Sequence, residues 1–167
     1  MSYWLRHRPE KIGIKLEKDG WVDVQELLGK AKSELEFTFE ELQEVVKNND
    51  KQRFSFSKDM KKIRANQGHS ADVKIDFKEI AAPPVLFHGT VSQFIDSIKK
   101  KGLIPGNRHH VHLSKDKETA EKVGSRRGAP VILNIDAMKM QDDGFKFYIS
   151  ENGVYLTDTV PPKYIKF

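Results

Sequence analysis

The sequence predicts an α+β protein of two lobes, a small winged-helix-like N-terminal lobe and a strand-rich C-terminal lobe. Before residue 50 the apolar residues recur with helical spacing, and the alternating Phe54 and Phe56 then indicate a β-hairpin. From Val85 onward, short apolar runs are separated by turn residues. The chain has 167 residues, 38% of them hydrophobic, so it can form one large or two small packed domains.

The N-terminal lobe is expected to hold helices before the hairpin. A helix over residues 3–8 ends at Pro9, and Asp19-Gly20 marks a turn before the apolar pair Trp21 and Val22. A second helix is indicated by the helical spacing of Val24, Leu27, Leu28 and Ala31. Thr38 and Glu41 form a capping box that opens a third helix. Phe54 to Phe56 and a strand running into Ile63 form the hairpin, and residues 1–70 make up the lobe.

Residues 71–84 are predicted to connect the lobes, because this stretch closes on Pro83-Pro84. The C-terminal lobe, residues 85–167, should begin with a strand over 85–88 and a helix whose basic last turn precedes Gly102. The elements expected after it are a strand over 111–113, a helix around 120–123, a strand over 131–135, a hairpin of 145–149 and 154–157 around Asn152-Gly153, and an edge segment over 160–165.

Composition excludes several classes of function. The chain has no cysteine, which excludes disulfides, thiolate metal sites and a cysteine nucleophile. It has neither an apolar run of membrane-spanning length nor a recognisable signal peptide, so no membrane association and a cytoplasmic setting are expected. The formal charge of +5 favours an anionic partner such as nucleic acid. Basic residues concentrate over 51–64, which is either a surface for a phosphate backbone or an exposed charged hairpin.

The segment 63–70 is the richest in polar donors, which are Arg64, Asn66, Gln67, His69 and Ser70. A fixed charge and many donors around a glycine suit a phosphate or another polyanion. A polar loop between two domains explains the same residues equally well.

Common catalytic signatures are absent, including a phosphate-binding glycine loop, a dinucleotide fingerprint and a helical zinc motif. His110 and His112 share one face of a predicted strand and could hold a metal, but no clustered acid or thiol completes the ligand set, and a packed histidine is the better interpretation of His110. Histidines and arginines are scattered over both lobes. They favour chemistry that stabilises anions, for which an ionised phosphate would be a suitable nucleophile.

Along nearly the whole chain, the order of its short motifs resembles that of the RNA 2′-phosphotransferase family. The motifs are Leu5-Arg6-His7, Asp19-Gly20-Trp21-Val22, residues 63–70, His88-Gly89-Thr90, Gly102-Leu103, residues 110–114, Val123-Gly124-Ser125-Arg126, and residues 152–157 with Val160-Pro161-Pro162.

The resemblance implies an RNA-binding winged-helix-like lobe and a mixed β lobe of the ADP-ribosyltransferase fold that binds NAD. It implies removal of an internal 2′-phosphate from RNA, as at a tRNA splice junction or in RNA repair, with NAD consumed and no metal required. In the first step the RNA 2′-phosphate displaces nicotinamide, which gives an ADP-ribosylated RNA phosphate. In the second step the ribose 2″-hydroxyl attacks phosphorus and releases ADP-ribose 1″,2″-cyclic phosphate. A monomer is expected.

The family's catalytic residues fall on Arg6, His7, Arg64 and Arg126. The arginines would grip the phosphate, and His7 would protonate the departing RNA 2′-oxygen, since imidazole exchanges protons near neutral pH. Taken alone, Arg6 could be a surface residue at a helix end and Arg126 a cation at a helix C-terminus. Arg127, the neighbour of Arg126, is the alternative ligand.

The residues that the resemblance assigns to NAD are His88, Gly89, Thr90, His112, Ser114 and Asn152. His112 stands where many relatives pack a tyrosine on nicotinamide. Val154 stands where transferases that modify proteins carry a glutamate that binds the ribose 2″-hydroxyl, so this hydroxyl would be free for the second step. Two other interpretations stay open, an ADP-ribosyltransferase acting on terminal phosphates of RNA or DNA, and a non-catalytic RNA-binding module.

Overall fold

The computed structural model describes residues 1–49 and 51–167, which form two compact units, Met1–Asp76 and Phe77–Phe167. The division falls inside the stretch 71–84 that was predicted to connect two lobes. Each unit combines short helices with small antiparallel sheets, which is compatible with the predicted α+β class. Within the described residues, no helix has the length and apolar character needed to cross a bilayer.

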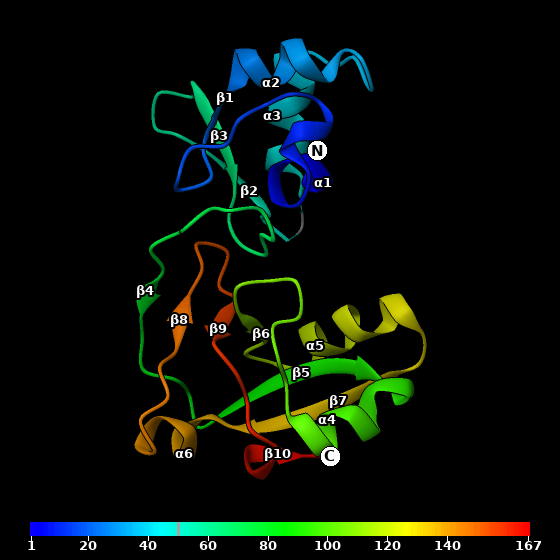
Figure 1. The fold of residues 1–167 in the computed structure, drawn as a ribbon, viewed down its shortest axis with the longest axis vertical. Helices are drawn as coiled ribbons and strands as arrows, with labels where there is room; N and C mark the ends of the chain where they lie inside the picture. The colour runs from blue at the N-terminus through cyan, green and yellow to red at the C-terminus, as the bar shows by residue number, and fades with distance from the viewer. Residues whose placement is uncertain (50) are drawn as a thin grey trace. The chain divides into compact units, whose positions relative to one another are not determined.

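The described residues of the first unit form three α-helices, a 3₁₀ helix and a three-stranded sheet in the order β1-β3-β2 (Figure 1). Its elements are α1 (Ser2–Arg6), η1 (Pro9–Lys11), β1 (Val22–Asp23), α2 (Val24–Ala31), α3 (Phe39–Lys47), β2 (Phe54–Phe56) and β3 (Lys62–Ala65). Both neighbours of β3 run antiparallel to it. The hairpin β2–β3 and the three helices were predicted, and β1 was not.

Local sequence explains where these helices begin. The Asp23 side chain accepts a hydrogen bond from the Glu26 backbone N–H at 3.0 Å and caps α2. Thr38 and Glu41 exchange the two hydrogen bonds of a capping box at the start of α3, as predicted. Pro9 lies after the end of α1 and is the first residue of η1. Proline cannot continue a helix from its interior, but it is well tolerated in the first turn of a new one.

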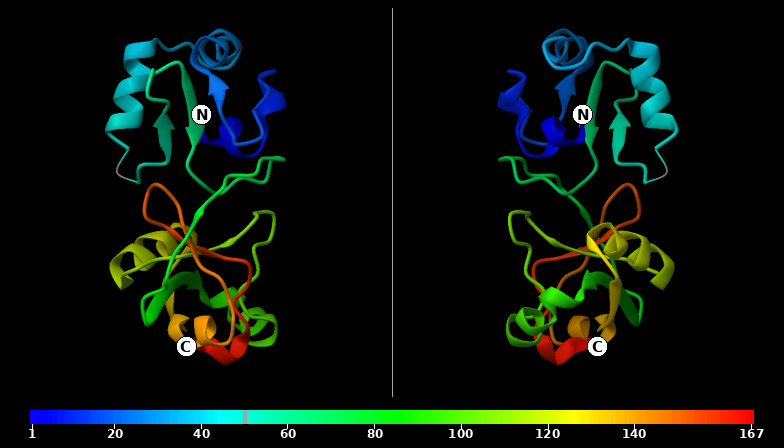
Figure 2. Two further views of the ribbon diagram at one scale, coloured as in Figure 1. Left: turned by 90° about the vertical axis from the view of Figure 1, so that its left-hand side faces the viewer. Right: turned by 90° about the vertical axis from the view of Figure 1, so that its right-hand side faces the viewer.

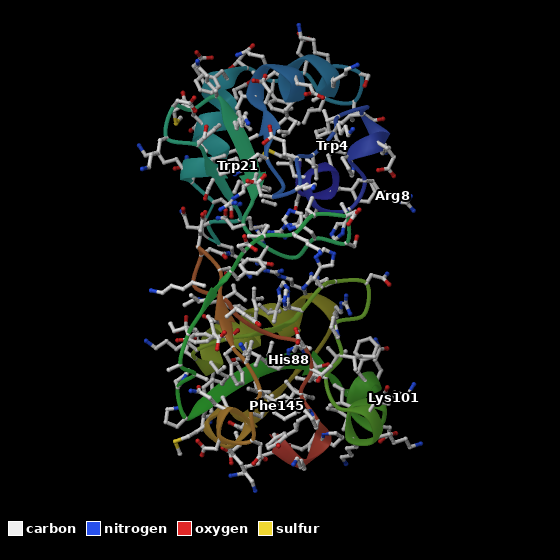
Figure 3. All side chains as sticks on the ribbon, turned by 60° about the vertical axis from the view of Figure 1, so that its left-hand side comes forward. Trp4, Arg8, Trp21, His88, Lys101 and Phe145 are labelled. Atoms are coloured by element: carbon white, nitrogen blue, oxygen red, sulfur yellow. The ribbon has the colours of Figure 1, made fainter. Side chains whose placement is uncertain are left out.

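The core of the first unit is formed by apolar residues from all of these elements, with the helices gathered around the small sheet (Figure 2). Leu5 of α1, Leu27 of α2 and Ile63 of β3 are fully buried. Trp4 points into this core, whereas the nearby Arg8 points outward (Figure 3). Burial of Leu5 against β3 fixes the end of α1 relative to the strand that carries Arg64.

The second unit has a three-stranded sheet β10-β7-β5 and a four-stranded sheet β4-β8-β9-β6. Its strands are β4 (Lys78–Glu79), β5 (Val85–Val91), β6 (Val111–Leu113), β7 (Pro130–Asp136), β8 (Tyr148–Ile149), β9 (Tyr155–Thr157) and β10 (Ile165–Lys166). Its helices are η2 (Ser92–Phe94), α4 (Ile95–Lys101), α5 (Lys117–Gly124), η3 (Ser125–Arg127), α6 (Ala137–Asp142) and η4 (Pro162–Tyr164). The long strands β5 and β7 run alongside each other throughout their length (Figure 1).

Most elements of this unit follow the prediction, including the hairpin β8–β9 and the placement of β10 at a sheet edge. Strand β5 continues to Val91, beyond the predicted end at residue 88, because it pairs with β7 over its whole length. Helix α6 was not predicted. The strand pairs of this unit, among its described residues, are antiparallel, which is compatible with the α+β class.

Candidate functional site

In the first unit, backbone hydrogen bonds bring the end of α1 to the segment that follows β3. The N–H groups of Ser70 and Ala71 donate to the Arg6 carbonyl oxygen at 2.9 and 3.0 Å. The last carbonyls of a helix have no partner inside the helix, and this one is satisfied by a segment far along the chain. The motif Leu5-Arg6-His7 and the segment 63–70 are therefore held together within one unit.

His7 and Arg6 lie at this junction in different environments. The Nδ1 atom of His7 lies 2.8 Å from the Ser70 hydroxyl oxygen, so the serine fixes one edge of the imidazole. Arg6 is only 8% exposed. This low exposure shows that the alternative of a surface residue at a helix end is wrong for Arg6. Burying a guanidinium is costly unless polar groups surround it.

Arg64 projects from β3 and stacks on an aromatic ring. Its guanidinium carbon lies 4.5 Å from the centroid of the Trp21 ring. On the strand, Arg64 faces Ser55 of β2. Cation–π contact with tryptophan limits the rotamers of the arginine without removing its charge.

The rest of the segment 63–70 is mostly interior. Asn66, Gln67, Gly68 and His69 are buried. Asn66 donates from its side chain to the Gln52 carbonyl at 2.7 Å, so it supports the loop before β2. The His69 ring packs on the turn at Gly20, where a Cβ would lie 3.4 Å from Nε2 and where φ is +84°. The burial of these residues shows that the segment takes part in packing.

In the second unit, His88, Gly89 and Thr90 lie on β5, and the backbone of α5 packs directly on this strand. A Cβ at Gly89 would lie 1.8 Å from the Ala120 carbonyl oxygen and 2.9 Å from the Gly124 nitrogen. Such distances exclude any side chain. The glycine of this motif is therefore explained by the close approach of helix and strand backbones.

Two hydrogen bonds define the protons on His88 and His112. The Nδ1 atom of His88 donates to the His112 carbonyl oxygen at 3.0 Å, because a carbonyl can only accept. Neutral His88 therefore keeps Nε2 as an acceptor. Arg108 Nη1 lies 3.4 Å from His112 Nδ1, and a guanidinium can only donate, so His112 carries its proton on Nε2.

His88 lies inside the second unit (Figure 3), and its surroundings favour the neutral ring. Burial lowers the pKa of His88, and the charge of Arg108 lowers it further, while the hydrogen bond to His112 acts in the opposite sense. The acceptor nitrogen of a neutral imidazole can accept a hydrogen bond from a hydroxyl or an amide N–H. This is chemistry that a ribose or carboxamide would use.

Arg126 and Arg127 lie on η3, which follows α5 and contacts β5. Both are exposed, so the interpretation of Arg126 as a cation beyond a helix C-terminus also remains. The guanidinium of Arg127 lies 5.9 Å from the centroid of Phe94. The contact of η3 with β5 places both arginines near the strand that carries His88.

Ser114 and Asn152 occupy backbone positions of different kinds. Ser114 exchanges two backbone hydrogen bonds with Phe87, at 2.9 and 2.8 Å, which joins the end of β6 to β5. The Asn152 side-chain oxygen accepts from the buried Ser150 hydroxyl at 2.7 Å. Ser150 also contacts both backbone groups of Val154, so this hairpin turn is internally braced.

His110 is packed against aromatic rings, as expected. Its ring makes edge contacts with Phe77 and Tyr148, and Nε2 lies 3.8 Å from Asp158 Oδ1. Across residues 1–49 and 51–167, no group of three or more histidines, cysteines or acids is arranged to hold a metal ion.

The sequence-predicted residues thus form two groups, each within its own unit. The first group, near the contact of α1 with β3, contains Arg6, His7 and Arg64. The second group lies around β5 and the β8–β9 turn, and it contains Arg126 and the residues that the resemblance assigns to NAD. Ser70, Trp21 and Arg108 contact these residues and were not predicted as site residues. Only the resemblance could have indicated Trp21 and Ser70, since both stand in its motifs, while Arg108 carries no signal in the sequence.

Comparison with known proteins agrees with the motifs. A family profile described as "RNA 2′-phosphotransferase, Tpt1 / KptA family" matches residues 1–159. A protein of Flavobacterium johnsoniae named "Probable RNA 2′-phosphotransferase" is 56% identical over 168 residues, covering 100% of this chain and 92% of its own. Proteins with the same name from Burkholderia pseudomallei and Trichormus variabilis are each 52% identical, cover 100% and 99% of this chain, and are themselves covered over 91%.

Proposed function

The chain belongs to the RNA 2′-phosphotransferase, Tpt1/KptA family, and we propose that it removes an internal 2′-phosphate from RNA in a reaction that consumes NAD. The observation that carries this proposal is the junction at the Arg6 carbonyl, where Ser70 and Ala71 hold Arg6 and His7 beside the segment of Arg64. Fixed cations and a titratable imidazole suit the transfer of a phosphate group. RNA of the spliced tRNA class is the proposed substrate.

The proposed reaction has two displacements. In the first, an oxygen of the RNA 2′-phosphate bonds to the ribose carbon of NAD that carries nicotinamide, and the bond to nicotinamide breaks. In the second, the neighbouring ribose hydroxyl loses its proton and bonds to phosphorus, and the bond from phosphorus to the RNA 2′-oxygen breaks. That oxygen takes up a proton, which leaves RNA with a 2′-hydroxyl and ADP-ribose 1″,2″-cyclic phosphate.

The phosphate needs no base before it attacks, because it is ionised at neutral pH. We propose that Arg6, Arg64 and Arg126 hold its oxygens and offset the charge that grows during the second displacement. Arg6 is buried, and Arg64 is stacked on Trp21, so their donors are oriented in advance. Pre-organised charge of this kind stabilises a transition state without reorganisation during the reaction.

His7 is the proposed general acid for the RNA 2′-oxygen. Its Nδ1 lies against the Ser70 hydroxyl, which orients the ring, and Nε2 is the nitrogen proposed to deliver the proton. In the protonated imidazole Nδ1 donates to the serine oxygen, so Ser70 supports the form that the second displacement requires.

NAD is the proposed second substrate, and the donors and acceptors of the second unit suit it. His88 offers a neutral acceptor and His112 an N–H donor, which complement ribose hydroxyls and the carboxamide. Thr90, Ser114 and Asn152 add polar groups near the same strands. We infer an ADP-ribosyltransferase-like fold for this unit and a winged-helix-like fold for the first.

The test is incubation with NAD of an RNA that carries one internal 2′-phosphate, in the presence of a chelator. We expect equal amounts of nicotinamide, RNA with a 2′-hydroxyl, and ADP-ribose 1″,2″-cyclic phosphate. The matched RNA without the 2′-phosphate should release no nicotinamide. Dependence on added metal, or ADP-ribose kept on the RNA as the final product, would contradict the proposal.

A variant pair tests which arginines matter near α1. Arg64→Gln should abolish product formation while NAD binding persists. Arg8→Gln removes an equal charge from the exposed ion pair with Glu10, 3.3 Å apart, and should leave the rate unchanged. Equal loss in both variants would mean that general electrostatics, and not the position of Arg64, controls the reaction.

A further inference from the structure

The outward face of strand β3 carries a second cation beside Arg64. Ile63 and Ala65 of this strand are buried in the core. Because side chains alternate along a strand, Lys62 and Arg64 share the opposite, half-buried face. Two residues span about 7 Å along a strand, so the two cations follow each other closely. A polyanion held at Arg64 would therefore meet Lys62 on the same face.

The turn that joins β2 to β3 adds two exposed lysines, Lys58 and Lys61, to the basic stretch 51–64. The acid of this turn is engaged locally. Asp59 Oδ1 accepts from the Ser57 hydroxyl at 2.6 Å and from the Lys61 backbone N–H at 3.2 Å. Among the ion pairs of residues 1–49 and 51–167, none joins Lys58 or Lys61 to a carboxylate. The turn thus presents two positive charges from a braced backbone.

Lys62 differs from the two lysines of the turn because it has a carboxylate partner. Its Nζ donates to Glu17 Oε1 at 2.6 Å, and both side chains are nearly half exposed. This hydrogen bond raises the pKa of Lys62, so the ammonium keeps its charge. Exposed ion pairs contribute little free energy, and a phosphate can therefore replace the carboxylate.

We propose that the outward face of this hairpin binds the diester phosphates that flank the 2′-phosphorylated nucleotide, through Lys62 and the two lysines of the turn. Glu17 competes with the RNA for Lys62. This inference rests on the proposed function, in which Arg64 holds the 2′-phosphate. Lysine is a flexible point charge that can follow a phosphate backbone of any sequence, so these contacts supply affinity and register without base preference.

Two RNAs separate this surface from the site of the reaction. We would measure by fluorescence anisotropy, without NAD, the binding of an oligonucleotide with one internal 2′-phosphate and of the same oligonucleotide without it. Lys62→Gln, and Lys58→Gln combined with Lys61→Gln, should weaken both RNAs alike, about fivefold for each lost phosphate contact at about 0.1 M salt, and should flatten the salt dependence. Arg64→Gln should weaken only the 2′-phosphorylated RNA.

The ion pair with Glu17 gives a test of opposite sign. Glu17→Gln releases Lys62 and should tighten the binding of both RNAs about twofold, the scale of an exposed ion pair. This gain should vanish in a Lys62→Gln background, because the two residues act through one contact. The matched control is the exposed pair of Lys32 and Glu36 in the same unit, 3.9 Å apart. Lys32→Gln and Glu36→Gln should leave both affinities unchanged.

Circular dichroism and the melting temperature establish that each variant is folded. Unchanged RNA affinity in the hairpin variants, an equal loss in Lys32→Gln, or a loss confined to the 2′-phosphorylated RNA would overturn the inference. A Glu17→Gln gain that persists without Lys62 would exclude the competition. If the hairpin variants weaken RNA binding as expected but the wild type releases no nicotinamide, the proposed function fails while the RNA surface stands.

Discussion

The Nδ1 atom of His7 lies 2.8 Å from the hydroxyl oxygen of Ser70, a residue 63 positions later in the chain. The two segments are already joined by backbone hydrogen bonds to the Arg6 carbonyl, so the serine adds orientation to a junction that exists without it. A hydrogen bond to one ring nitrogen orients the imidazole and sets the direction in which its other nitrogen points.

Removing this hydroxyl should therefore affect catalysis more than folding. Ser70→Ala leaves the backbone contacts intact, and we expect kcat to fall about five- to tenfold, as for the loss of one hydrogen bond of about 1 kcal/mol. The KM for RNA should change little. Ser70→Thr, which keeps the hydroxyl, should restore most of the rate. An unchanged kcat in the alanine variant would exclude a positioning role.

Trp21 should matter through Arg64. Trp21→Leu removes the ring 4.5 Å from the guanidinium carbon, and we expect affinity for the 2′-phosphorylated RNA to fall about fivefold, the scale of a partly exposed cation–π contact. NAD binding should be retained. Binding titrations with both substrates check this. If Trp21→Leu weakens RNA binding equally in an Arg64→Gln background, the ring contacts the RNA by itself.

Gly89 should be indispensable for folding of the second unit. Gly89→Ala places a methyl group 1.8 Å from the Ala120 carbonyl oxygen, so α5 must move away from β5. We expect the free energy of unfolding to fall by more than about 3 kcal/mol, as in a severe steric clash within a core. Gly153→Ala is the comparison variant, because an added Cβ at this turn would meet no atom within 4 Å. Its backbone φ of +76° is unfavourable for alanine, so this variant should still lose some stability. Denaturant unfolding of the two variants checks the difference.

Acid should destabilise the protein through His88. Its pKa is lowered in the folded chain, so between the ordinary value of 6.5 and the folded value the unfolded state binds the extra proton. The stabilising contribution of neutral His88 is present above pH 6.5 and is lost as the pH falls toward the folded pKa. Unfolding free energy measured from pH 8 to pH 5 should decline less steeply in His88→Gln. Identical slopes would show that folding does not lower the pKa of His88.

Val154 should influence the second displacement. Val154→Glu would give the ribose hydroxyl a carboxylate partner and hold back the nucleophile, so ADP-ribosylated RNA phosphate should accumulate while nicotinamide release continues. Val154→Gln tests whether charge is needed. Quantifying the intermediate on gels over time checks the effect, and an intermediate level equal to that of the wild type would refute it.

The sequence predicts elements that carry strong local signals. The capping box of Thr38 and Glu41, and the turn at Asn152-Gly153, each depend on neighbouring residues and were located correctly. Strand β1 could not be predicted in this way, because Val22 and Asp23 form a strand only by pairing with β3, about forty residues later. Helix α6 was missed, although Asp136 caps it, because its six residues are too few for a clear helical period.

The motifs predicted which residues belong to the candidate site, but the geometry of the site could not be predicted from them. Arg6 resembles an exposed residue at a helix end, and only tertiary packing buries it. The contact of Arg108 with His112 depends on the path of a loop, which no periodicity specifies. Likewise, sequence alone does not distinguish a glycine that approaches a ligand from one, such as Gly89, that approaches a helix backbone.

That backbone contact has a mechanical consequence. Side chains at an interface can change rotamer and let two elements slide, but at Gly89 and Gly124 main chain meets main chain, and there is nothing between them to rearrange. Helix α5, the turn η3 with its two arginines, and the strand of His88 should consequently behave as one stiff body. A ligand that shifts the backbone of η3 must therefore shift the backbone of β5 with it, because the two segments are joined through this contact.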